Sequence, residues 1–358
     1  MRIFQQHQAD LGATDFSDRR RDRARQHRPH RDRGLPLDVS ARDRFDEVGI
    51  EQQRRALQHR TCHVGLIAAQ RMNDIPGTPA LIDGLSDIAS TYDAVICDVW
   101  GVLHNGKQAF LAAADAMRRF RAERGPVVLL TNAPRLADGV EWLFDRVGLP
   151  KDFYDGIVTS GSAARADLER RTEGGRTLPM FYLGPPRDNP LFEGLNLQRV
   201  TPEEAEIVLC TGLFDDDTET PDDYRAMLEK FRARGLPFLC ANPDIVVQRG
   251  DKLIYCAGAI ARLYESMGGE VVYYGKPYPA VYERALGELR ARGPVKRPLM
   301  IGDGIETDIL GAQRMGLDAL FIGGGIHGAE LKEHPEALAN LLKKNGVSPR
   351  AAMPVLVW

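Results

Sequence analysis

The sequence has 358 residues, of which 43% are hydrophobic and 27% charged, and its formal net charge is −3. These proportions exclude a fibrous or low-complexity chain, and the small net charge gives no sign of a polyanionic partner. The five cysteines form no CxxC pair, and the sequence has neither a signal-peptide core nor an apolar run of membrane-spanning length, so we expect a reduced, cytoplasmic protein without a membrane segment.

The first 71 residues differ in composition from the rest. They hold 15 arginines, no lysine and 10 acidic residues, which sum to +5, and their apolar residues follow no regular period. Such a segment buries too little apolar surface to offset the entropy of ordering, so we predict an Arg-rich, disordered N-terminal extension over residues 1–75. A basic arm for nucleic acid is one alternative, which the interleaved aspartates disfavour. Translation that starts at Met72 is another.

From Ile82 onward, short apolar runs alternate with amphipathic stretches. The predicted strands are Ala94–Cys97, Val127–Leu130, Gly156–Thr159, Val271–Tyr274, Leu299–Ile301 and Ala319–Ile322. The predicted helices are Ala109–Arg124, Leu136–Val147 and Pro279–Arg292, each followed by a glycine stop signal. This alternation predicts an α/β fold with a doubly wound, Rossmann-like parallel sheet and helices on both faces.

The stretch 165–268 interrupts this pattern with turn-rich and acidic segments. It still contains two predicted strands, Glu206–Cys210 and Pro237–Cys240, and one predicted helix, Pro221–Arg234. We therefore predict a core domain over residues 76–164 and 269–358, with a second α/β module over residues 165–268, the cap domain of the resemblance given below, inserted into it.

Four groups of polar residues follow predicted strands, at the sheet edge where open α/β sheets bind ligands. Asp98 ends the first strand and can attack phosphorus, and Gly101 lets the backbone approach a phosphate closely enough for its N–H to donate. Thr131 and Asn132 follow the second strand and can hydrogen-bond phosphate oxygens. Taken singly, these are also ordinary turn and helix-entry residues.

The other two groups lie late in the sequence. Lys276 stands between a strand and a helix, where an ammonium can stabilise a phosphoryl group. Asp303 ends a strand and Asp308 follows about one helical turn later, and Mg²⁺ prefers such carboxylate ligands. Taken singly, a surface lysine and a helix N-cap would explain them.

Taken in order, the four groups resemble the motifs of haloacid dehalogenase superfamily phosphatases: an Asp turn, Thr-Asn, Gly-Lys-Pro and Gly-Asp-x-x-x-x-Asp. The long gap between the second and third groups resembles the class IIA branch, which includes nitrophenylphosphatase-like proteins. So do the stretches Val158–Gly161, Ala241–Asp244 and Cys256–Ala259. The resemblance implies a capped fold and the Mg²⁺-dependent hydrolysis of a small phosphorylated metabolite through an aspartyl-phosphate on Asp98.

The resemblance also implies a role for individual residues. The implied metal ligands are Asp98, Trp100 through its carbonyl, Asp303 and Asp308. The implied phosphate-binding residues are Gly101, Thr131, Asn132 and Lys276, of which Lys276 is also catalytic. The candidate substrate contacts are Asn242, Asp244 and His104.

Trp100 departs from the family pattern, in which a second aspartate at this position acts as general acid and base. Indole exchanges no proton, and losing such a group costs about 10²–10⁴-fold in rate. Three interpretations stay open: hydrolysis of substrates with good leaving groups, proton transfer by His104 or a cap residue, or binding of phosphorylated ligands with little turnover. The last would make the protein a sensor. The sequence identifies neither the substrate nor the oligomeric state, and a homo-oligomer is one of the states that it allows.

Overall fold

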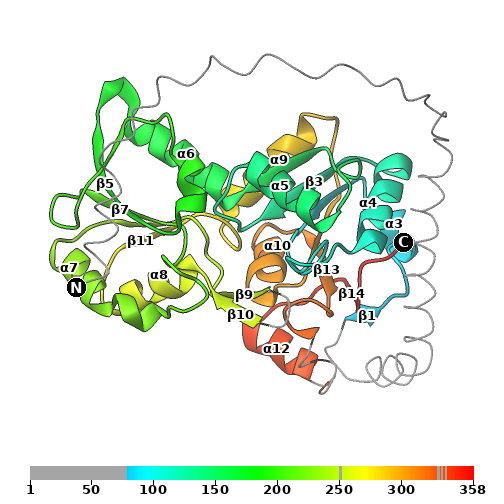
Figure 1. Ribbon diagram of the computed structural model, residues 1–358. Helices are drawn as coiled ribbons and strands as arrows, with labels where there is room; N and C mark the ends of the chain where they lie inside the picture. The colour runs from blue at the N-terminus through cyan, green and yellow to red at the C-terminus, as the bar shows by residue number, and fades with distance from the viewer. Residues whose placement is uncertain (1–78, 250–251, 329–330, 332–333, 335–336) are drawn as a thin grey trace, which may run out of the picture. The chain divides into compact units, whose positions relative to one another are not determined.

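The computed structural model describes residues 79–249, 252–328, 331, 334 and 337–358 (Figure 1). The predictions for the Arg-rich extension, including a start at Met72 and a nucleic-acid arm, lie outside the described residues. Among the described residues, no helix combines the length and the apolar character that crossing a bilayer requires.

A seven-stranded sheet, which we call the core sheet, is parallel throughout. Its spatial order is β1-β14-β13-β12-β2-β3-β4. The strands are β1 (Ala80–Leu81), β2 (Ala94–Cys97), β3 (Val127–Thr131), β4 (Gly156–Thr159), β12 (Pro298–Gly302), β13 (Asp318–Ile322) and β14 (Ala351–Met353). After β2 the chain adds β3 and β4 on one side of it, and later β12, β13 and β14 on the other side. The carboxyl ends of β2 and β12 therefore form a topological switch point, where such folds bind ligands.

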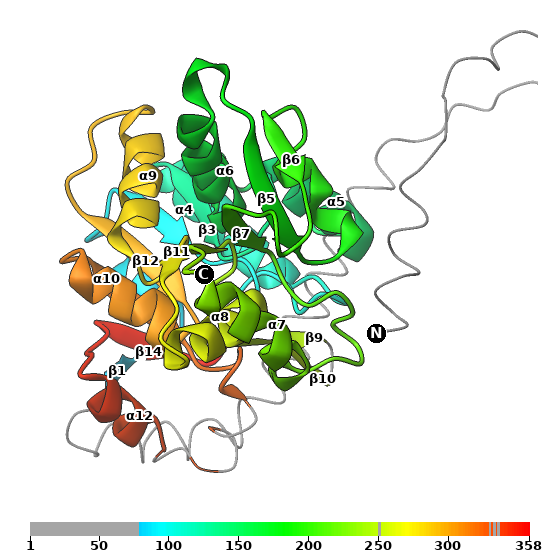
Figure 2. The same cartoon turned by 90° about the vertical axis from the view of Figure 1, so that its left-hand side faces the viewer.

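Alternate residues of the central strands face two separate apolar layers. In β2, Val95 and Cys97 pack into one layer, and Ala94 and Ile96 pack into the other. The first layer is covered by α3 (Ser86–Ala89), α4 (Leu111–Glu123) and α5 (Ala137–Val147). The second is covered by α9 (Pro279–Arg290), the π-helix η4 (Ile305–Ile309), α10 (Leu310–Arg314) and α12 (Ala337–Asn345). Figure 2 shows α9, α10 and α12 along its left-hand side. Burial on both faces explains why these strands read as continuous apolar runs.

A second parallel sheet, the cap sheet, has the order β11-β8-β7-β5-β6. Its strands are β5 (Leu178–Leu183), β6 (Leu197–Arg199), β7 (Ile207–Cys210), β8 (Phe238–Cys240) and β11 (Val271–Tyr273). One face is covered by α7 (Arg225–Ala233) and α8 (Ala257–Ser266). The other is covered by α6 (Ser160–Arg171) and the 3-10 helix η2 (Pro186–Leu191). Two further 3-10 turns are η1 (Glu173–Gly175) and η3 (Pro221–Tyr224).

A two-stranded antiparallel ribbon, which we call the hairpin, connects β8 to α8. It consists of β9 (Val246–Arg249) and β10 (Lys252–Tyr255). The side chains of Leu253 and Tyr255 are exposed. No strand besides β9 pairs with β10 in the described part of the chain.

The predicted fold class, a doubly wound parallel sheet with a separate α/β insert, is confirmed. The exact limits of the core and cap domains stay a prediction. One observation bears on them: β11 pairs with β8 in the cap sheet, although the predicted boundary at residue 268 assigned Val271–Tyr273 to the core. An apolar strand carries the same sequence signal in either sheet, so periodicity could not assign it.

Candidate active site

A cavity of about 150 Å³ lies at the carboxyl ends of β2, β3 and β12. We call its first side the core wall, formed by Asp98, Thr131, Lys276, Asp303 and Asp308. We call its second side the hairpin wall, formed by Asp244, Val246, Val247 and Gln248. The remaining lining residues are Trp100, Gly101, Asn105, Phe110, Asn132, Gly304, Thr307, Gly324, Gly325 and Ile326.

The register of the core sheet brings the acidic residues of the core wall together. Ile301 of β12 pairs with Cys97 of β2, and the Asp98 N–H donates to the Ile301 carbonyl at 2.8 Å. Asp98 and Asp303 therefore leave neighbouring strands at the same level. One carboxylate oxygen from each of Asp98, Asp303 and Asp308 lies within 4.8 Å of the other two, and all three residues are buried. We call these three residues the acidic cluster.

Backbone N–H groups fix the two later members of the acidic cluster. Asp303 Oδ2 accepts from the Ile326 N–H at 2.7 Å, and Asp308 Oδ2 accepts from the Gly304 N–H at 2.9 Å. The loop that holds Ile326 approaches so closely that a Cβ at Gly325 would lie 1.9 Å from Asp303 Oδ2. The glycine-rich turn over residues 323–328 therefore rims the cavity, and its contact with Asp303 could not be predicted, because the sequence carries no signal for a long-range backbone donor.

Gly101 satisfies a similar packing requirement from the β2 side. It has φ of +91°, and a Cβ at this position would lie 2.1 Å from Asp303 Oδ2. Its N–H donates to the His104 carbonyl at 2.8 Å. The predicted donation of this N–H to a phosphate would require that bond to break, so the geometry favours a role in close packing instead.

Lys276 is the single basic residue among the described residues that line the cavity. Its side chain is 3% exposed, and its Nζ makes ion pairs with Asp98 Oδ1 and, at 2.6 Å, with Asp308 Oδ1. Burial favours the neutral amine, but Asp308 and Asp98 outweigh it and raise the pKa of Lys276. The ammonium therefore stays charged and links the nucleophile candidate to the rest of the acidic cluster.

The acidic cluster nevertheless carries more negative charge than Lys276 balances. Burial, with added repulsion from Asp98 and Asp308, raises the pKa of Asp303 well above its usual range. Burial also raises the pKa of Asp308 to about 7, although Lys276 opposes the shift. With all three carboxylates ionised, the single ammonium would leave an excess of two negative charges. A divalent cation matches that excess, and hard carboxylate oxygens are the donors that Mg²⁺ prefers.

Thr131 and Asn132 extend the core wall beyond β3. Thr131 Oγ1 accepts from the Ala133 N–H at 3.2 Å, which leaves its hydroxyl hydrogen available to a ligand. Asn132 Oδ1 accepts from the Lys276 N–H at 2.7 Å, and its Nδ2 donates to Asp244 Oδ1 at 2.7 Å and to the Lys276 carbonyl at 3.2 Å. Asn132 thus fixes Lys276 and Asp244, and its two amide hydrogens are already donated.

Trp100 connects the core sheet to the hairpin. Its Nε1 donates to the Gln248 carbonyl at 2.7 Å, and its ring packs edge-on against His104 with centroids 5.0 Å apart. Its own carbonyl accepts no hydrogen bond from the residues that the structure describes, so it is available to a cation. The indole therefore holds the hairpin beside the cavity.

Two candidate substrate contacts lie outside the cavity lining. His104 is 1% exposed beneath Trp100, its Nδ1 accepts from the Gly106 N–H at 3.0 Å, and its Nε2 has no partner among the described residues. Burial lowers its pKa to about 4. Asn242 Oδ1 accepts from the Asp244 N–H at 3.2 Å, so it shapes the turn that carries Asp244. Of the three candidates, Asp244 alone lines the cavity.

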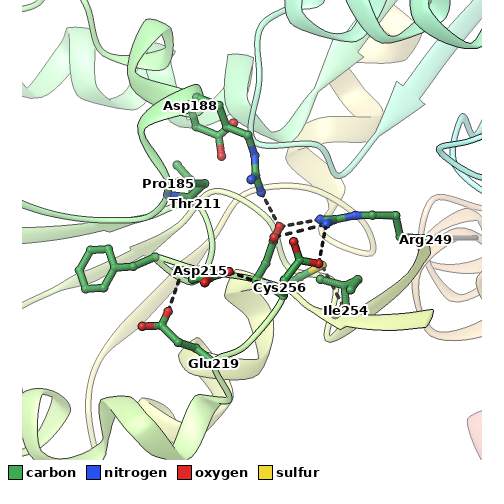
Figure 3. Close-up of polar contacts among 12 residues, drawn as sticks. Pro185, Asp188, Thr211, Asp215, Glu219, Arg249, Ile254 and Cys256 are labelled. Atoms are coloured by element: carbon green, nitrogen blue, oxygen red, sulfur yellow. Dashed lines mark hydrogen bonds and ion pairs between the residues drawn. The ribbon is translucent and has the colours of Figure 1, made fainter. Parts of the chain in front are cut away.

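The hairpin is anchored on its far side by a group of ion pairs (Figure 3). Arg249 Nη2 contacts Asp216 Oδ2 at 2.6 Å, its Nη1 contacts Asp217 Oδ1 at 3.4 Å, and Arg187 also pairs with Asp216. Residues 215–217 are three consecutive aspartates, a composition typical of a solvated acidic loop or of a cation site. Arginine side chains satisfy two of the three carboxylates instead, and this arrangement ties β9 to the cap sheet's loops.

Comparison with protein families points to one superfamily. A model described as haloacid dehalogenase-like hydrolase matches residues 95–198, and one described as HAD-hydrolase-like matches residues 273–344. The first match begins in β2, just before Asp98, and the second contains Lys276, Asp303 and Asp308.

Individual relatives agree with the family models. A haloacid dehalogenase-like hydrolase structure from Brucella suis 1330 is 40% identical, has a TM-score of 0.67, and covers 77% of this chain and 100% of its own. The ribonucleotide monophosphatase NagD of Escherichia coli (strain K12) is 28% identical over 240 residues, which are 66% of this chain and 89% of NagD. A glycerol phosphate phosphatase structure from Mycobacterium tuberculosis, in complex with magnesium, is 22% identical with a TM-score of 0.51, and covers 70% of this chain and 74% of its own.

Proposed function

Because the chain belongs to the haloacid dehalogenase superfamily, in the class IIA branch of NagD- and p-nitrophenylphosphatase-like hydrolases, we propose that it is a Mg²⁺-dependent phosphatase of a small phosphorylated metabolite. The observation that carries the proposal is the convergence of the acidic cluster and Lys276 in one buried cavity. Family membership supports the reaction class. Within the proposal, residues 76–164 and 269–358 form the core and the insert forms the cap.

Mg²⁺ fits the acidic cluster by charge and donor type. Asp98, Asp303 and the Trp100 carbonyl would hold it, and Asp308 would support them. Bound there, the ion supplies a Lewis acid that polarises the phosphoryl oxygens and neutralises part of their charge. The two negative charges that Lys276 leaves unbalanced support this assignment.

The chain's own residues would carry out two successive displacements at phosphorus. The Asp98 carboxylate attacks in line, the bond from phosphorus to the ester oxygen breaks, and an aspartyl-phosphate forms. Lys276 neutralises the phosphoryl oxygens, and the Thr131 hydroxyl donates to one of them. Water then attacks the same phosphorus, the bond to Asp98 breaks, and phosphate leaves. Asn132 keeps Lys276 in position through both steps.

A substrate screen with full-length protein tests the proposal. Nitrophenyl phosphate, glycerol phosphates and nucleoside monophosphates would be offered with Mg²⁺ and with a chelator, and released phosphate measured. We expect Mg²⁺-dependent turnover that falls by at least about 10⁴-fold in Asp98→Asn, because no nucleophile remains. Asp222→Asn, on a carboxylate whose side chain is 79% exposed, is the matched control and should leave the rate unchanged.

Two outcomes would contradict the proposal. Turnover retained in Asp98→Asn would refute the nucleophile assignment. Binding of phosphorylated compounds without turnover in the wild-type protein would support the alternative, a sensor of phosphorylated metabolites. The cytoplasmic location and a homo-oligomeric state stay predictions.

A further inference from the structure

We propose that the carboxyl group of Asp244, on the hairpin wall, is the catalytic acid and base of this site. The inference rests on the proposed phosphatase function and adds to it the group that moves the proton. It is argued from the titratable residues of the cavity, from the hydrogen bonds of Asp244 and from the direction of the displacement.

The reaction needs a proton twice. When Asp98 attacks phosphorus, the ester oxygen leaves with the bonding electron pair, and a poor leaving group requires a proton at that moment. The Asp244 carboxylic acid would give that proton, which yields the alcohol and the Asp244 carboxylate. When water attacks the aspartyl-phosphate, the carboxylate takes a proton from the water, Asp98 is released and Asp244 is protonated again. The sum is ester plus water to alcohol plus phosphate.

Asp244 is the titratable group of the cavity lining that is needed neither as the nucleophile, nor as a cation ligand, nor as the ammonium beside the phosphoryl group. The titratable side chains of the lining are Asp98, Asp244, Lys276, Asp303 and Asp308. The acidic cluster supplies the nucleophile and the cation ligands, and Lys276 is ion-paired to two of its members. No histidine, cysteine, tyrosine or glutamate lines the described part of the cavity.

The contacts of Asp244 hold one carboxylate oxygen and leave the other to the cavity. Oδ1 accepts from Asn132 Nδ2 at 2.7 Å. Oδ2 has no hydrogen-bond partner within the described ranges, and no cation there forms an ion pair with Asp244. Burial, with Lys276 opposing it, raises the pKa of this carboxyl, so a proton on Oδ2 is retained more readily than on an exposed aspartate.

The turn that carries Asp244 is fixed in place, as a proton donor requires. The Asp244 N–H donates to Asn242 Oδ1 at 3.2 Å, and Pro243 packs against Gly275 so closely that a Cβ there would lie 2.9 Å from Pro243 Cγ. Gly275 directly precedes Lys276. The position of the carboxyl is therefore set from the core wall, through Asn132 and Gly275, as well as from the hairpin.

The direction of the displacement favours a donor on the hairpin wall. In an in-line reaction the leaving oxygen departs opposite the attacking oxygen. Asp98 attacks from the end of β2, in the core wall, so the leaving oxygen moves away from the core sheet. Asp244 follows β8 of the cap sheet and is the first residue of the hairpin wall in the sequence. The other candidates lie elsewhere, because His104 is buried beneath Trp100 and the Trp100 N–H is donated to Gln248.

Asp244→Asn tests the inference with two aryl esters that differ in leaving group. The amide oxygen can still accept from Asn132, so the fold is retained, but no proton is exchanged. We expect kcat/KM for phenyl phosphate, a poor leaving group, to fall about 10²–10⁴-fold. For nitrophenyl phosphate, whose leaving group needs little protonation, kcat/KM should fall less than about tenfold.

Three further readouts separate proton transfer from a structural role. The variant should show a burst of nitrophenol, because the water step also loses its base. Asp244→Glu, which keeps a carboxyl, should recover part of the phenyl phosphate activity. Asn132→Ser, which releases both Lys276 and Asp244, should lower kcat/KM for nitrophenyl phosphate through Lys276 and should lower it further for phenyl phosphate, because the Asp244 carboxyl is no longer held in place.

The outcomes distinguish this inference from the proposed function. If wild type hydrolyses both esters and Asp244→Asn lowers the two kcat/KM values equally, or lowers neither, Asp244 is not the proton donor, while the phosphatase assignment stands. If wild type hydrolyses neither ester nor any compound of the metabolite screen, the phosphatase assignment fails and the role of Asp244 fails with it.

Discussion

The core wall of the cavity is buried and ion-paired, whereas the hairpin wall is partly open to solvent. Lys276 and Asp308 are 3% and 1% exposed, and each is held by another charged residue. In the hairpin wall, Val246 and Val247 are half-buried and Gln248 is exposed. Two hydrogen bonds connect this wall to the core sheet, from the Trp100 indole to the Gln248 carbonyl and from Asn132 to Asp244. In the proposed reaction the core wall would therefore hold the phosphoryl group on a closely packed scaffold, and the hairpin wall, apart from Asp244, would face the rest of the substrate.

The core wall should also tolerate the loss of a side chain less well than the outer surface of the molecule does. A buried charge that loses its partner costs several kcal/mol, whereas an exposed ion pair contributes about 0–1 kcal/mol. Changes in the core wall should therefore reduce stability and activity together. Changes on the outer side of the molecule should do neither, and the first two predictions below compare the two.

The largest effect is expected for Lys276→Met. It leaves Asp98 and Asp308 without their shared cation, so we expect activity to fall below detection and the free energy of unfolding to drop by about 3–5 kcal/mol, measured by urea titration. Lys230→Met removes an ion pair with Glu203 in which both side chains are more than 60% exposed, and should change stability by less than about 1 kcal/mol. Equal effects of the two substitutions would erase the contrast between buried and exposed charge.

An intermediate effect is expected for Gly325→Ala. The new Cβ would overlap Asp303 Oδ2, so Asp303 must shift, and we expect the Mg²⁺ concentration for half-maximal activity to rise at least about tenfold. Gly287→Ala is the matched control, because nothing lies within 4 Å of its Cβ on the exposed side of α9. That change should leave the Mg²⁺ requirement alone and stabilise the helix by up to about 1 kcal/mol. An unchanged Mg²⁺ requirement in Gly325→Ala would argue against Asp303 as a ligand.

The smallest effect concerns His104 and the pH dependence of stability. Its folded-state pKa of about 4 lies below the ordinary 6.5, so the unfolded chain binds a proton between these values that the folded chain does not. Stability should therefore fall as pH drops from 6.5 toward 4, by up to about 3 kcal/mol from this residue. Urea titrations of wild type and His104→Asn over this range should converge as pH falls; parallel curves would show that His104 does not titrate in this way.

Much of the core wall could be predicted from sequence because three of its five residues end an apolar strand or directly follow one. Asp98, Thr131 and Asp303 all stand at the carboxyl ends of parallel strands, and such ends meet at one sheet edge. The family resemblance then assigned a role to each of these residues. The pairing of Lys276 with two aspartates was not predictable, because it depends on the path of the chain between the two sheets.

The hairpin wall was largely missed, for physical reasons. Gly250-Asp251 stands between Val246–Arg249 and Lys252–Tyr255 and is a two-residue turn signal for a hairpin. The two strands are short, however, and Ile254 is their one buried side chain, so they show little of the alternation by which strands are predicted. Their position depends on long-range contacts such as the Trp100 bond to Gln248 and the ion pair of Arg249 with Asp216. Asn132 shows the same limit: its residue type suggested a phosphate ligand, but its amide is engaged by Lys276 and Asp244.

The most direct test of the account is to locate the covalent phosphate during turnover. Full-length protein would be mixed with nitrophenyl phosphate and Mg²⁺, quenched in acid and reduced with borohydride, which converts an aspartyl-phosphate into homoserine. Peptide mass spectrometry then identifies the converted residue. The account predicts conversion at Asp98 and at no other aspartate. Conversion at Asp244, Asp303 or Asp308 in an enzyme that turns over would contradict it.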